Sequence, residues 1–95
     1  MMDRETILHF LKSHKAQLQE SYGVEEIGLF GSYARGEATE QSDIDLVVDM
    51  PSSFTAFFGL QEYLERMLGK RIDLGMKQKL RAYIHEKIKD EIIYV

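Results

Sequence analysis

The stretch VEEIGLFGSYARGEATEQSDIDLVV, residues 24–48, contains two apolar segments joined by a small, polar connection. Residues 24–30 gather β-branched and aromatic side chains and stop at Gly31, which predicts a first strand. DIDLVVDM, residues 43–50, has the same character and predicts a second strand, which Pro51 ends. The connection between them predicts one short helical turn followed by a loop.

Helices are predicted on both sides of this stretch, because apolar residues recur there at helical spacing. The first runs from Asp3 to Tyr22, and the second follows a cap at Ser52 or Ser53 and ends near Gly69. KRIDLGM, residues 70–76, predicts a third strand, and a last helix is predicted from Leu80 to Val95. The predicted buried stripes are Ile7, Leu8, Leu11, Leu18 and Tyr22, then Phe54, Phe57, Phe58, Leu64 and Leu68, and finally Leu80, Ile84, Ile88 and Ile92.

This alternation of helices and strands predicts an α/β (α+β) fold with two layers. A small mixed sheet would be covered by helices on one face, and the opposite face would carry the polar chemistry. The sequence has no internal repeat, low-complexity tract or linker, so residues 1–95 are expected to form a single domain.

Composition restricts the classes of function. Hydrophobic residues make up 44% of the chain, which is enough for a globular core. The absence of cysteine excludes disulfides, thiolate metal sites and a cysteine nucleophile. The net charge of −4 argues against direct nucleic-acid binding, and no segment resembles a signal peptide or a membrane span. A cytoplasmic protein without membrane contact is expected.

Two carboxylates are predicted to stand side by side on the second strand. Because side chains alternate between the faces of a strand, Asp43 and Asp45 project to one side while Ile44 and Leu46 enter the core. Their charges repel unless a cation lies between them, and Mg²⁺ prefers oxygen ligands of this kind. Taken alone, the pattern more often describes two aspartates that simply face water.

Two further elements add to this pair. Gly31 and Ser32 lie between a strand and a helical turn, where free backbone N–H groups can receive phosphate oxygens. Asp73 lies on the third predicted strand and shares a face with Arg71. It is a candidate third carboxylate, as a metal ligand or as the base for an attacking hydroxyl, although an exposed aspartate paired with Lys70 or Arg71 would show the same pattern.

The segments GSYARG, residues 31–36, and SDIDLVV, residues 42–48, resemble the nucleotidyltransferase signature of the DNA polymerase beta superfamily. The chain is similar over nearly its whole length to the minimal nucleotidyltransferases. The resemblance implies that Gly31 and Ser32 hold the triphosphate, with Arg35 near phosphate and Gly36 permitting the turn. It implies that Asp43, Asp45 and Asp73 bind metal, and two Mg²⁺ ions with ATP as substrate are expected.

Minimal nucleotidyltransferases also resemble the antitoxins of toxin–antitoxin pairs whose toxin is a HEPN-domain ribonuclease. This resemblance implies transfer of AMP from ATP to a tyrosine of the toxin, within a hetero-oligomer. Two alternatives stay open: a non-catalytic antitoxin that covers the toxin sterically, and the catalytic subunit of a small-molecule nucleotidyltransferase.

Overall fold

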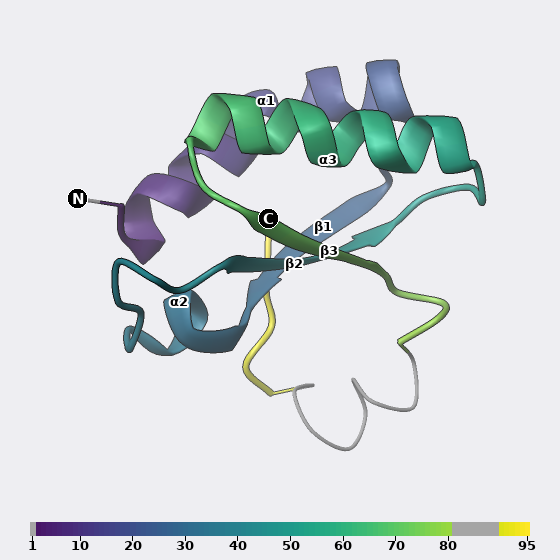
Figure 1. Ribbon diagram of the computed structural model, residues 1–95. Coiled ribbons are helices and arrows are strands. Elements are labelled where there is room, and N and C mark those ends of the chain that lie inside the picture. The colour runs from purple at the N-terminus through teal and green to yellow at the C-terminus, as the bar shows by residue number, and fades with distance from the viewer. Residues whose placement is uncertain (1, 81–89) are drawn as a thin grey trace.

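Four strands form one mixed sheet in the computed structural model, which describes residues 2–80 and 90–95 (Figure 1). Strand β1 (Glu26–Phe30) pairs antiparallel with β2 (Ile44–Asp49) and with β4 (Ile93–Tyr94). Strand β2 pairs in parallel with β3 (Ile72–Met76), so the order across the sheet is β3-β2-β1-β4. The three predicted strands are confirmed, each two residues shorter than expected.

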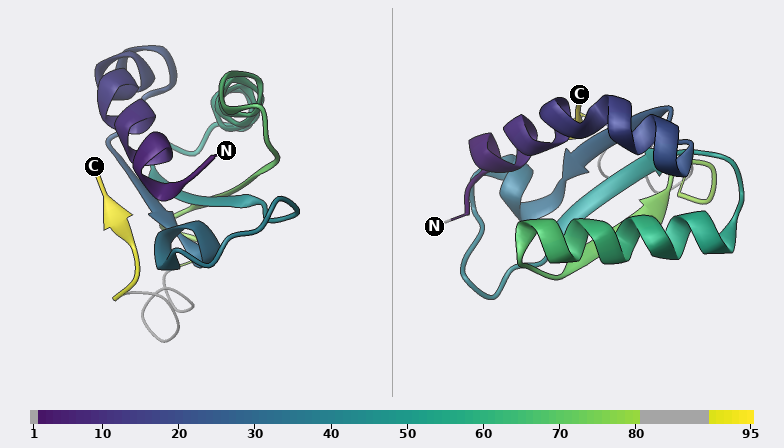
Figure 2. Two further views of the ribbon diagram at one scale, coloured as in Figure 1. Left: turned by 90° about the vertical axis from the view of Figure 1, so that its left-hand side faces the viewer. Right: turned by 90° about the horizontal axis from the view of Figure 1, so that it is seen from above.

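Helices α1 (Arg4–Tyr22) and α3 (Phe54–Leu68) lie side by side over one face of the sheet (Figure 2). The carboxylate of Asp3 caps α1 by accepting a hydrogen bond of 2.9 Å from the Thr6 N–H. Ser53 caps α3 by accepting a hydrogen bond from the Ala56 N–H. The predicted two-layer α+β fold is confirmed. None of the described helices is long and apolar enough to cross a membrane.

The core lies between these two helices and the sheet. Alternation along β2 sends Ile44, Leu46 and Val48 into it, as predicted, while Val47 points to the opposite face and is covered there by a smaller apolar group. The helices and β1 contribute most of the other fully buried side chains, which include Ile7, Leu11, Leu18, Ile27, Leu29, Leu60 and Leu64. The sheet is therefore apolar on both faces around its centre, and polar chemistry is left to its ends.

The end of the chain corrects the prediction of a helix that extends to Val95. Ile93 and Tyr94 form β4 on the outer edge of β1, where the Val95 N–H donates to the Ile27 carbonyl and the Lys15 ammonium donates to the Val95 carbonyl. Contacts with residues far away in the sequence override the local preference for a helix here. The predicted stripe residues Ile84 and Ile88 lie outside the described residues.

The apolar stripe of α3 is also only partly buried. Leu64 and Leu68 lie in the core as predicted, but Phe54 is 76% exposed and Phe58 is 58% exposed. Both side chains lie at the start of α3 beside β3, the last strand on that side of the sheet, so no further strand covers them. The prediction that these two phenylalanines are core residues was wrong.

Candidate active site

The centre of the site is a direct contact between the Gly31 backbone and the Asp45 side chain. Gly31 directly follows β1 and begins α2 (Gly31–Arg35) with a φ of +77°, a conformation that glycine adopts without strain. Phe30 pairs with Asp45 across the sheet, so the aspartate lies beside the turn. A Cβ atom at Gly31 would overlap a carboxylate oxygen of Asp45. Only glycine allows the two segments to approach this closely.

Asp73 lies beside Asp45 on the other side, because these two residues are paired in the parallel register of β2 and β3. A proton shared between the two carboxyl groups favours the neutral form of Asp45. Partial burial, the charge of Asp73 and the charge of Asp43 together raise the pKa of Asp45 to about 6, while Arg35 opposes the shift. At neutral pH this arrangement holds more negative charge than the protein neutralises.

Asp43 precedes β2 and lies farther from the pair. Its carboxylate is 3.5 Å from the guanidinium of Arg71, and it borders a polar hollow of about 400 Å³ that Ser42 and Lys70 also line. Among residues 2–80 and 90–95, no three His, Cys, Asp or Glu side chains are grouped closely enough to hold a metal ion together. The structure thus joins two of the three predicted carboxylates and pairs the third with an arginine.

The remaining predicted residues belong to α2 and its end. Ser32 is its second residue, and Gly36 ends it with a φ of +73°. The guanidinium of Arg35 lies between two glutamates, 2.9 Å from Glu37 and 3.1 Å from Glu91. All four predicted residues of segment 31–36 therefore lie within or directly after one helical turn beside Asp45.

Glu91 is a site residue that the sequence did not reveal. Its carboxylate accepts a hydrogen bond of 2.7 Å from the Gly31 N–H and also binds Arg35. The residue was assigned to a helix, and its distance of sixty positions from Gly31 offered no local signal. Only the pairing of β4 with β1 brings it to this place.

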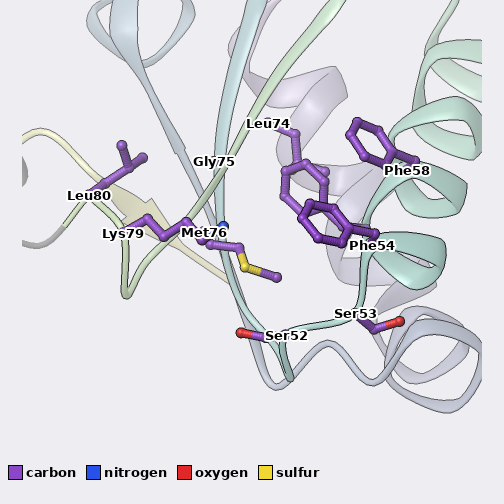
Figure 3. Close-up of a pocket in the computed structure, with 10 residues that line it drawn as sticks. Ser52, Ser53, Phe54, Phe58, Leu74, Gly75, Met76, Lys79 and Leu80 are labelled. Atoms are coloured by element: carbon purple, nitrogen blue, oxygen red, sulfur yellow. The ribbon is translucent and has the colours of Figure 1, made fainter.

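An apolar hollow of about 390 Å³ lies at the outer edge of β3 (Figure 3). Phe54 and Phe58 line it from one side of the strand and Leu80 from the other. Leu74 and Gly75, which directly follow Asp73, form part of its wall. The hollow therefore adjoins the strand that carries one of the two paired carboxylates.

Substitution of Gly31 tests the contact with Asp45. We expect Gly31→Ala to lower the free energy of unfolding by roughly 2 to 4 kcal/mol, because the positive φ and the overlap with the carboxylate both oppose a Cβ. Gly69→Ala is the matched control, since Gly69 has a φ of +69° and open space around it, and a loss of only about 1 kcal/mol is expected. Urea titration measures both, and equal losses would contradict the contact.

The raised pKa of Asp45 predicts a pH dependence of stability in metal-free buffer. The folded state takes up a proton at about pH 6, whereas the unfolded state does so near the ordinary value of 3.8, so stability should rise as the pH falls from 7 towards 5. Asp45→Asn removes the carboxyl group that takes up this proton. We expect the variant to be more stable than the wild type at pH 7 and to lose that advantage by pH 5, as measured by thermal unfolding with chelator. A difference that does not change with pH would contradict the shift.

Comparison with known proteins shows which family the chain belongs to. The chain matches the nucleotidyltransferase domain family over residues 11–95. It is 47% identical to the protein adenylyltransferase MntA of Thermococcus cleftensis, with 100% of this chain and 98% of that protein aligned. A proposed protein adenylyltransferase of Methanocaldococcus jannaschii is 44% identical over 94% of both proteins.

A solved structure of a proposed minimal nucleotidyltransferase has the same fold, with a TM-score of 0.79 and 33% identity. The match covers 97% of this chain and 95% of that chain. Sequence and fold agree over almost the entire length. This chain therefore belongs to the nucleotidyltransferase domain family, among its minimal members.

Proposed function

We propose that this protein transfers AMP from ATP to a tyrosine hydroxyl of a partner protein, a HEPN-domain ribonuclease toxin, and so acts as its antitoxin. The observation that carries the proposal is the pair of adjoining carboxylates, Asp45 and Asp73, packed against the Gly31 turn. Relatives that align over their full length and are named protein adenylyltransferases support a protein acceptor. The toxin and its tyrosine rest on the resemblance of the chain to known antitoxins.

Each of the site residues has a separate role in the proposed reaction. Gly31 and Ser32 bind the triphosphate through a backbone N–H and a hydroxyl, and Arg35 adds positive charge beside them. The tyrosine oxygen attacks the α-phosphorus, a new P–O bond forms, and the bond to the β-phosphate breaks to release pyrophosphate. Asp73 accepts the proton of the tyrosine hydroxyl. No covalent intermediate with the protein is needed.

The carboxylates fit a bound Mg²⁺ by their chemistry. Asp45 lies beside Asp73, is also affected by the charge of Asp43 and has a raised pKa, which is the electrostatic situation that a cation relieves. Mg²⁺ is commonly held by one or two carboxylates together with substrate phosphates, and Asp43, Asp45 and Asp73 would supply the protein's share. When bound, the metal withdraws charge from the phosphate oxygens.

The apolar hollow beside β3 supports a protein acceptor. Exposed aromatic side chains gathered around a concave surface are typical of protein interfaces, and Phe54 and Phe58 form such a group. A partner docked there would lie beside the strand that carries Asp73.

Transfer should depend on both paired carboxylates. We expect Asp45→Ala and Asp73→Asn to reduce AMP transfer about 100-fold or more, since the first removes a proposed metal ligand and the second removes the base. Asp49→Asn is the control, because Asp49 lies farther along β2, and full transfer is expected. The partner's intact mass after incubation with ATP and Mg²⁺ gives the extent of modification. A partner that stays unmodified by wild type while growth is protected would favour steric neutralisation instead.

Docking should depend on the exposed phenylalanines. We expect Phe58→Ser to weaken binding of the partner about tenfold, because it removes an exposed aromatic anchor from the hollow. Affinity for ATP should not change. Met67→Ser is the control, since Met67 is 48% exposed on the same helix but does not line the hollow. Calorimetry with the purified partner measures both, and an equal loss in the two variants would argue against this docking surface.

A further inference from the structure

The carboxylate of Glu91 occupies the groups that are proposed to receive the nucleotide's triphosphate. It accepts a hydrogen bond of 2.7 Å from the Gly31 N–H, and its two oxygens lie 3.3 and 3.1 Å from the same nitrogen of Arg35. A backbone N–H and a guanidinium are the donors that a phosphate oxygen would use. Glu91 therefore presents a negatively charged oxygen pair to a place that a triphosphate needs.

Strand pairing holds Glu91 in this position. Gly28 pairs with Tyr94 and Leu29 with Ile93, and continuing this antiparallel register by two residues sets Glu91 opposite Gly31. The edge is held further by Lys77, whose ammonium is 2.7 Å from Glu26 and lies over the Tyr94 ring. The carboxylate is thus fixed by the fold and is not a freely rotating surface charge.

Arg35 is shared between two glutamates that differ in their contacts and in their exposure. Glu37 contacts the guanidinium alone and its side chain is 67% exposed, whereas Glu91 contacts the guanidinium and the Gly31 N–H and is 23% exposed. The exposed ion pair contributes little, because water screens it. The less exposed carboxylate takes up both donors.

We infer that Glu91 is a built-in competitor of the triphosphate, an autoinhibitory contact that a nucleotide must displace before it binds to Gly31 and Arg35. This inference rests on the proposed function, since it assigns the triphosphate to these donors. The contact regulates the site through affinity. The free energy needed to displace Glu91 makes nucleotide binding weaker, while the reacting groups on β2 and β3 stay unchanged. The contact thus sets the nucleotide concentration at which the enzyme becomes occupied.

The test compares binding of inorganic triphosphate and of ATP with Mg²⁺ to the purified full chain by calorimetry. Glu91→Gln removes the competing charge and should tighten binding of both ligands roughly tenfold. Glu37→Gln makes the same change of charge at the same arginine without touching the Gly31 N–H, and should stay within about twofold of wild type. Glu91→Asp, whose shorter side chain withdraws from the N–H, should tighten binding in the same direction by a smaller factor. Thermal unfolding checks that each variant is folded.

The outcomes separate this inference from the proposed function. Tighter binding by the two Glu91 variants but not by Glu37→Gln, with a lower KM for ATP and an unchanged kcat, supports the competitor. Equal or weaker binding by Glu91→Gln and Glu91→Asp overturns it and makes Glu91 a structural support of the turn. An equal gain in affinity in Glu37→Gln also overturns it, because the gain would then come from the lower negative charge and not from the Glu91 contact. If wild type and variants all fail to bind triphosphate, the competitor falls together with the assignment of this site, whereas bound triphosphate at unchanged affinity removes the competitor only.

Discussion

The approach of the Asp45 carboxylate to the Gly31 backbone determines how the rest of the site is arranged. Because Gly31 has no side chain and a φ of +77°, β1 can turn directly into α2 while leaving room for the aspartate of the neighbouring strand. Asp45 is paired with Phe30 on one side and with Asp73 on the other, so its position in the middle of the sheet links both neighbours. Three segments distant in the sequence meet at one carboxylate.

This convergence leaves an electrostatic imbalance in the folded protein. Burial and two neighbouring carboxylates favour the neutral form of Asp45, and Arg35, the cation that opposes them, is itself engaged by Glu37 and Glu91. Groups that repel one another in the absence of a ligand are commonly retained where function requires them, at some loss of stability. This imbalance is the physical reason to expect a cation at this end of the sheet. The expectation depends on these local charges and not on the net charge of the chain, which is −4.

Local patterns were sufficient for much of this fold and for part of the site. Alternation along β2 correctly sent Ile44 and Leu46 to the core, and apolar spacing located α1 and most of α3. Local patterns could not show which strand lies at an edge. The edge position of β3 explains why Phe54 and Phe58 are exposed although they continue a buried stripe. They also could not show that Ile93 and Tyr94 pair with β1, and Glu91 was missed for the same reason. The functional roles of the predicted site residues stay predictions.

The order of the strands agrees with the geometry that the proposed reaction requires. In an in-line displacement the attacking and leaving oxygens lie on opposite sides of the phosphorus. The sheet separates the corresponding protein groups across Asp45: Asp73 and the apolar hollow lie towards β3, whereas Gly31, Ser32 and Arg35 lie towards β1 and α2. In the proposed reaction, an acceptor approaching over the β3 edge would meet a nucleotide whose polyphosphate is held from the β1 side, where Glu91 contacts the Gly31 N–H. The proposal thereby assigns nucleotide binding and acceptor docking to opposite sides of Asp45 in one sheet, so that either could change without disturbing the other.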